Sequence, residues 1–103
     1  METDLSIHAR EKLWLSVHAL ATGRGRIHER MLLAARCLMK VSDKGLPDDI
    51  VRRRHSLISK LTSQDAVGDK KPLETTLEGM DEEEVVAIAK DICDLWSMSP
   101  DAV

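Results

Sequence analysis

The sequence predicts an all-α protein: a single small domain, built as a bundle of four principal helices and a short extra helix, with the segment at about residues 26–41 at its centre. Three observations carry this prediction. The 103 residues are 43% hydrophobic but include two Trp and no Phe or Tyr, and a core of Leu, Ile, Val, Met and Ala suits helices better than strands. Apolar residues recur at helical spacing, without strand-like alternation. Glycines and prolines separate the periodic segments.

The first two predicted helices are separated by Gly23 and Gly25, which act as helix stop and restart. The first helix covers about residues 4–21, and its apolar face is formed by Ala9, Leu13, Trp14, Val17, Leu20 and Ala21. The second covers about residues 26–41 and is apolar around most of its circumference, apart from a polar strip. A helix of this kind is buried on more than one side, so this segment is predicted to be the central element.

The third predicted helix begins at Pro47, which fits the first helical position because its missing N–H costs nothing there. It continues to about residue 62, with apolar residues on one face. The following segment, residues 63–71, is polar and contains a glycine. It is therefore predicted to be a flexible loop.

Two further helices are predicted near the end of the sequence. Residues 72–78 favour a short helix of two turns. Asp81 is followed three residues later by Glu84, and this capping-box pattern predicts the start of a long helix that ends before Pro100.

The composition also bears on the cellular compartment of the protein. No run approaches 18 uncharged apolar residues, so we expect no membrane span. The chain opens with Glu2 and Asp4 rather than a basic region, so we expect no secretory signal. Cys37 and Cys93 lie in apolar faces and are interpreted as core residues rather than a disulfide framework. These features together predict a cytoplasmic protein.

The net charge of −3 conceals an asymmetry along the chain. Residues 1–60 contain 12 Lys and Arg against 7 Asp and Glu, whereas residues 61–103 contain 3 against 11. Because these charges are dispersed along the predicted helices, we interpret them as two parts that pack on each other, within or between chains.

No metal, cofactor or catalytic pattern is apparent. The four histidines, His8, His18, His28 and His55, include no pair at i and i+4, and we interpret them as solvated surface residues. There is no CxxC pair and no Gly-x-Ser-x-Gly segment. We therefore expect no metal site, no cofactor and no enzymatic activity.

Arg10 and Arg54 fall within predicted apolar stripes, where a guanidinium needs a partner because an unpaired buried charge is costly. Arg10 lies one turn from Trp14, which permits a cation–π contact. The acidic part of the chain offers candidate carboxylates, namely Glu74, Glu78, Asp91 and Asp94. We expect the two arginines to form structural ion pairs or to snorkel at the edge of the core or, alternatively, to line a pocket for an anionic ligand.

The segment from Thr22 to Arg26 combines two glycines, Arg24, Arg26 and a helix N-terminus, which together suit a phosphate or carboxylate. The competing interpretation is a tight connection between antiparallel helices, with both arginines in solvent.

Nucleic-acid binding is a further alternative, carried by the basic residues of the second and third helices and the turn before them, Arg24, Arg26, Arg30, Arg52 and Arg53. The second and third helices loosely resemble a helix-turn-helix. However, Asp48 and Asp49 would enter the DNA groove first and repel the phosphates, so we do not expect nucleic acid as a partner.

The leading hypothesis is a small protein–protein interaction or adaptor module that acts as a homodimer or binds a helical partner. It rests on the excess apolar circumference of the second helix and on apolar residues outside the main faces. The candidate interface residues are Leu15, Leu32, Leu33 and Met39.

Overall fold

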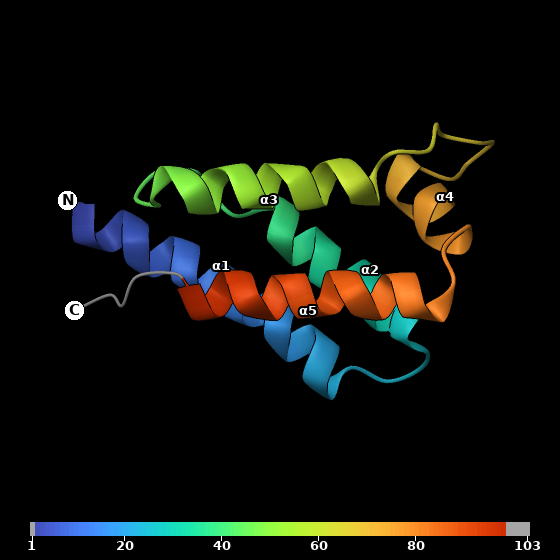
Figure 1. The fold of residues 1–103 in the computed structure, drawn as a ribbon, viewed down its shortest axis with the longest axis horizontal. Helices are drawn as coiled ribbons and strands as arrows, with labels where there is room; N and C mark the ends of the chain where they lie inside the picture. The colour runs from blue at the N-terminus through green and yellow to red at the C-terminus, as the bar shows by residue number, and fades with distance from the viewer. Residues whose placement is uncertain (1, 99–103) are drawn as a thin grey trace.

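The computed structural model describes residues 2–98, with the side chains of residues 8–98, and has the predicted all-α fold. Five helices follow one another along the chain: α1 (Glu2–Thr22), α2 (Ile27–Met39), α3 (Asp48–Leu61), α4 (Pro72–Glu78) and α5 (Glu82–Met98) (Figure 1). Each lies within about two residues of its predicted range, and the short helix matches it at both ends. Pro100, the expected stop signal for the last helix, lies outside the described residues.

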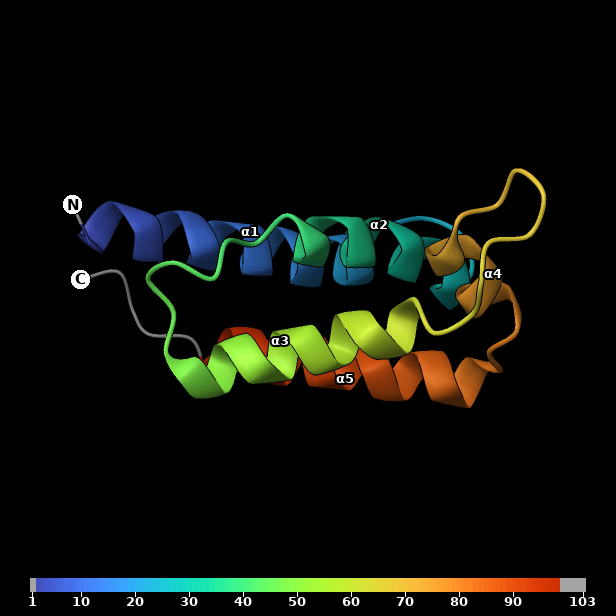
Figure 2. The same ribbon diagram turned by 90° about the horizontal axis from the view of Figure 1, so that it is seen from above.

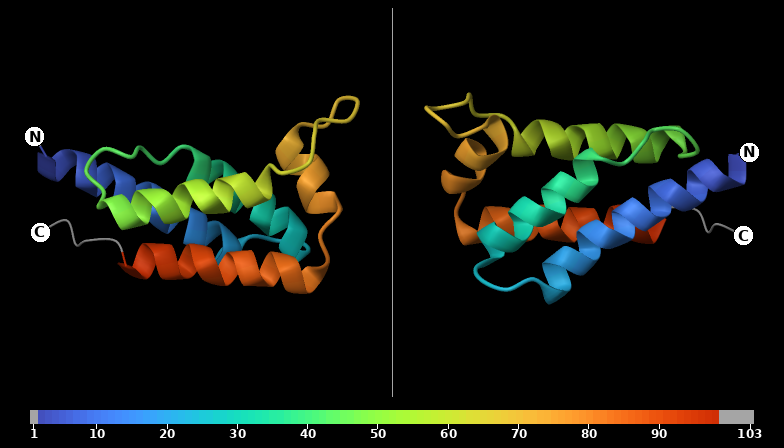
Figure 3. Two further views of the ribbon diagram at one scale, coloured as in Figure 1. Left: turned by 45° about the horizontal axis from the view of Figure 1, so that its top comes forward. Right: turned by 180° about the vertical axis from the view of Figure 1, so that it is seen from behind.

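The helices form two layers (Figure 2). One layer is the antiparallel hairpin of α1 and α2, and the other contains α3 and α5, which also run antiparallel. The hairpin crosses the second layer at an angle, and α4 closes one end of the bundle (Figure 3). This arrangement leaves one long side of α1 and one long side of α5 on the outside of the molecule.

The hairpin is close-packed because small residues meet where α1 crosses α2. Ser16 is buried and its hydroxyl donates a hydrogen bond to the backbone carbonyl of Ala34, with an Oγ–O distance of 2.7 Å. Ala9 and Ala35 are also buried. A larger side chain at Ser16 would hold the helices apart and remove this bond.

The predicted central position of α2 is confirmed, since α2 contacts all four other helices. Its buried side chains are Met31, Ala34, Ala35 and Leu38. Its apolar perimeter is nevertheless wider than its neighbours cover, because Leu33 and Met39 remain 51% and 44% exposed. The rest of the chain therefore buries much of α2 but leaves part of its apolar surface in solvent.

The predicted capping box at the start of α5 is present. The backbone N–H of Glu84 donates to Oδ1 of Asp81 at 2.8 Å, and the N–H of Asp81 donates to Oε1 of Glu84 at 3.3 Å. Two backbone donors that the first helical turn cannot satisfy are thereby bonded.

Three sequence-based expectations about burial are wrong. Trp14 is 45% exposed rather than a core residue, because it lies at the edge of the apolar face of α1. Cys93 is exposed and Cys37 only half-buried, so neither is a fully buried core residue. His28 is not a solvated surface residue, because it is half-buried and its Nε2–H donates to the carbonyl of Met80 at 2.7 Å.

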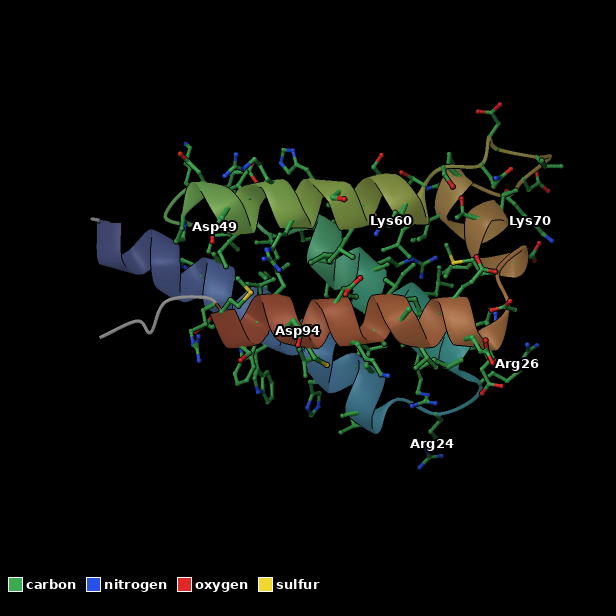
Figure 4. The ribbon with its side chains drawn as sticks, viewed as in Figure 1. Arg24, Arg26, Asp49, Lys60, Lys70 and Asp94 are labelled. Atoms are coloured by element: carbon green, nitrogen blue, oxygen red, sulfur yellow. The ribbon has the colours of Figure 1, made fainter. Side chains whose placement is uncertain are left out.

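The expected packing of basic on acidic parts of the chain occurs between α3 and α5. A hollow of about 190 Å³ between them is lined by Arg53 and Lys60 of α3 and by Asp91 and Asp94 of α5. Figure 4 labels Lys60 and Asp94 on these two neighbouring helices. These four residues are exposed, and among the described side chains no ion pair joins them across the hollow.

The loop at 63–71 is exposed but has internal structure. The backbones of Val67 and Lys70 exchange hydrogen bonds of 3.0 and 3.1 Å. Lys70 forms an ion pair with Glu78 of α4, with an Nζ–Oε1 distance of 2.6 Å, and the N–H of Gln64 donates to the hydroxyl of Thr76. Flexibility of this loop stays a prediction.

Candidate interaction surface

The four candidate interface residues do not gather on one face. Leu15 of α1 is 39% exposed, and helical phase places it, with Leu33 of α2, on the outer side of the hairpin. Leu32 is half-buried and borders a hollow beside α4, together with Leu77 and Met80 among others. Met39 borders a second hollow, beside Pro72 and Leu73. These residues therefore mark two separate surfaces, one on the hairpin and one over α4.

A more continuous apolar surface lies between α1 and α5. We call it the α1–α5 groove and define it by its lining residues, which enclose about 380 Å³: Val17, Leu20, Ala21, Ile27, Val86, Ala89, Lys90, Cys93 and Asp94. Most of this lining is apolar, and Lys90 and Asp94 stand along the α5 margin. An apolar groove with a charged rim is the usual form of a helix-binding surface.

The two tryptophans of the protein lie on α1 and α5, the helices that form most of this groove. Helical phase places Trp14 on the same flank of α1 as Arg10 and Ala21, and its ring stacks on His18 with centroids 4.7 Å apart. Trp96 is on the flank of α5 that faces α1, and the guanidinium of Arg10 lies 4.8 Å from its ring centroid. The aromatic partner of Arg10 is thus Trp96, on another helix, rather than Trp14. Exposed Trp is enriched among residues that dominate binding energy at protein interfaces.

Arg54 has a different role, since it is buried and bonded to its own chain. Its Nε donates to the carbonyl of Leu38 at 3.0 Å and its Nη2 to that of Met39 at 3.1 Å, at the C-terminal end of α2. Its Nη1 forms an ion pair with Oδ1 of Asp43 at 3.0 Å. His55 Nε2 lies 2.9 Å from the other oxygen of the same carboxylate. A cation is favourable here because the final carbonyls of a helix are unsatisfied and carry partial negative charge.

The candidate partners of Arg54 from the acidic part of the chain are therefore wrong. Glu78 pairs with Lys70, and Glu74 lies 3.9 Å from the guanidinium of Arg36. Asp91 and Asp94 line the hollow between α3 and α5. Asp43 was missed because it belongs to the connection between α2 and α3, whose path the sequence pattern does not specify.

Arg24 and Arg26 are exposed in the connection between α1 and α2 (Figure 4). Gly25 has a φ of 92°, and a Cβ added there would overlap the carboxylate of Glu29. A carboxylate of the chain itself thus occupies the space beside the first turn of α2. This leaves the two arginines as solvated charges around an N-terminal turn that already holds an acidic group.

The basic residues considered for nucleic acid are spread over the molecule. Arg24 and Arg26 lie at one end of the hairpin, whereas Arg52 and Arg53 are on α3 in the other layer (Figures 2 and 4). Arg30 is directed inward, and its Nη1 donates to the carbonyl of Leu20 at 2.9 Å. The residues proposed from the sequence are not brought together as one patch.

Among the side chains of residues 8–98, no three from His, Cys, Asp or Glu are grouped so that they could hold a metal ion. His8 and His18 are exposed, and His55 is exposed while contacting Asp43. Within residues 2–98, no helix is long and apolar enough to cross a membrane.

Comparisons with protein-family models, curated proteins and solved structures gave no match.

Proposed function

We propose that this protein is a small cytoplasmic interaction module that acts as a homodimer, with the α1–α5 groove and the adjoining face of α5 as its contact surface. The observation that carries the proposal is the apolar groove of about 380 Å³ between α1 and α5, whose lining includes Val86 at 37% exposure. Contiguous apolar surface that a folded chain leaves uncovered marks sites of association.

The burial pattern supports self-association over a purely structural explanation. Val86, at 37% exposure, lines the groove, and Trp14 of α1 and Met98 of α5 are 45% and 42% exposed. A chain of about 100 residues buries only some 60–65% of its unfolded surface, so its stability gains from covering such residues with a second copy. Isologous dimers achieve this with one surface used twice.

The free cysteines agree with the proposed compartment. Cys37 and Cys93 are not joined to each other. Cys93 is exposed at the groove, and the reducing cytoplasm would keep such a thiol reduced.

Sedimentation velocity over a concentration series tests the proposal directly. We expect the 11.5 kDa chain to shift towards twice its mass between about 10 and 500 µM, the range expected for a small interface. Val86→Asp should weaken this shift, because it places a charge in the apolar contact. The matched control is Val67→Asp, at a loop valine that is 63% exposed and far from the groove, and it should leave the shift unchanged. A monomer at every concentration would refute the homodimer.

A further inference from the structure

The outer face of α5 carries a ridge of four side chains spaced four residues apart: Val86, Lys90, Asp94 and Met98. Residues at this spacing are neighbours on a helix surface and form one of the ridges through which helices pack. All four are exposed, and the two apolar members keep 37% and 42% of their surface in solvent. Three of them, Val86, Lys90 and Asp94, also line the α1–α5 groove. The ridge is thus the α5 margin of the candidate surface.

The two central charges of the ridge are not used inside the chain. Among the described residues, neither Lys90 nor Asp94 forms an ion pair, although they stand at i and i+4 on one helix. Asp94 borders the hollow that also contains Lys60, without bonding to it. Both charges therefore remain available to a partner that approaches the outer face of α5.

From Val86 to Met98, the side chains of the ridge are apolar, positive, negative and apolar. A second copy of the ridge in the opposite direction therefore places opposite charges and apolar side chains against each other. If a second copy of α5 lies antiparallel across it, with a twofold axis midway between Lys90 and Asp94, each Lys90 meets Asp94 of the other copy. The same operation places each Val86 against Met98 of the other copy. Ala87 and Ser97, which flank the ridge, also face each other, and their small side chains allow close approach of the helices.

We propose that two copies of this protein associate through antiparallel α5 ridges, with two symmetric Lys90–Asp94 ion pairs between two Val86–Met98 contacts. This rests on the homodimer proposed above and specifies its surface, symmetry and register. The charge pattern favours a second copy over an unrelated helix, because one operation satisfies both charges and both apolar ends. Since one helix and the groove margin supply the contact, we expect a weak dimer with a dissociation constant on the order of 10–100 µM.

Charge reversal at the two central positions tests the register. In Lys90→Asp, both symmetric pairs become Asp–Asp, and in Asp94→Lys both become Lys–Lys. Each variant should dimerise at least about tenfold more weakly than wild type, because two attractive pairs become two repulsive ones. Asp65→Lys, an equal change of charge at an exposed loop residue, should leave the dissociation constant within about twofold.

Mixing the two variants gives the decisive result. When K90D is combined with D94K, both pairs become Asp–Lys again, so a heterodimer should form with nearly wild-type affinity although each variant alone dimerises at least about tenfold more weakly. Native mass spectrometry of one isotopically labelled and one unlabelled variant distinguishes the heterodimer from homodimers. A mixture of K90D with D65K should show no such recovery. The double variant K90D/D94K, which exchanges both charges within one chain, should also dimerise.

The outcomes separate the two proposals. A dimeric wild type whose charge-reversed variants dimerise unchanged, or fail to recover on mixing, would overturn the ridge and leave the homodimer on another surface. A wild type that is monomeric throughout would overturn both proposals. Circular dichroism of each variant should match wild type, since the substituted side chains are exposed and bond to no other described residue.

Discussion

At the C-terminal end of α2 a positive charge is buried and bonded, whereas on the outer face of α5 a positive charge stands in solvent beside an unbonded carboxylate. The side chain of Arg54 is 9% exposed and donates to two backbone carbonyls and to Asp43. Lys90 and Asp94 are exposed, and no ion pair holds them within residues 2–98. Arg54 therefore stabilises the folded chain, while the ridge of α5 is free to contact another molecule.

The two basic residues differ in role because the groups around them differ. Arg54 lies against the C-terminal end of α2, where the carbonyls of Leu38 and Met39 accept hydrogen bonds from its guanidinium. Lys90 lies on a helix flank, where the backbone acceptors are already bonded within the helix. Buried charges should thus govern stability, and exposed charges should govern association.

The largest effect is expected from Arg54→Leu. Leucine fills part of the same space but removes the guanidinium donor from the carbonyl of Met39 and leaves that of Leu38 with only the N–H of Val41, so the free energy of unfolding should fall by about 3 kcal/mol. Urea denaturation followed by circular dichroism measures this loss. Arg53→Leu, one residue earlier and exposed, should change the free energy by less than about 0.5 kcal/mol. Equal effects of the two substitutions would remove the distinction between buried and exposed cations.

Gly23→Ala tests a second arginine that caps a helix end. Arg30 donates to the carbonyl of Leu20 near the C-terminal end of α1, and its side chain passes close to Gly23. An added Cβ would lie 2.5 Å from the carbonyl oxygen of Ala19 and 2.9 Å from Cγ of Arg30. The resulting displacement should cost about 1–2 kcal/mol of unfolding free energy.

Gly79→Ala is the matched control for this substitution. The nearest atom to its added Cβ is the carbonyl oxygen of Thr76, at an ordinary contact distance of 3.7 Å. We expect a neutral or slightly stabilising effect, because alanine restricts the unfolded chain. Thermal unfolding of both variants measures the change in unfolding free energy. An equal loss of stability in Gly79→Ala and Gly23→Ala would argue against the close approach of Arg30.

Much of this fold follows from local sequence signals. The capping box of Asp81 and Glu84 marked the start of α5, and the prolines and glycines around residues 47 and 72–78 marked helix boundaries. The many apolar positions of α2 predicted its central place. These features depend on residues close together in sequence, where periodicity and capping specify the structure.

The candidate surface was harder to predict because it depends on which helices become neighbours. Trp14 belongs to the predicted apolar stripe of α1, but helical phase places it at the outer edge of that stripe, where the ring is 45% exposed. Arg54 was expected to need a partner, yet Asp43 comes from a connection whose path the pattern leaves open. Leu15 and Met39 were predicted as interface residues but lie on different surfaces.

Asp43→Asn tests an ion pair in which one partner, Arg54, is buried and the other, Asp43, is partly exposed. The carboxylate is bonded to Arg54 and His55, but its side chain is 46% exposed, so water screens part of the interaction. We expect a loss of about 1 kcal/mol, smaller than for Arg54→Leu because both carbonyl bonds to Arg54 remain. Asp65→Asn, at an exposed loop residue, should have no measurable effect in the same urea titration.

The smallest effect expected is that of salt on association. Charges on the exposed ridge of α5 are screened by mobile ions, so raising NaCl from about 0.05 to 0.5 M should weaken the wild-type dimer roughly threefold. The neutral double variant K90Q/D94Q should dimerise more weakly at low salt and lose most of this salt dependence. The destabilisation caused by Arg54→Leu should be nearly the same at both salt concentrations, because its carbonyl bonds are buried. Sedimentation equilibrium at the two salt concentrations measures the association, and an unchanged salt dependence in K90Q/D94Q would show that other charges hold the copies together.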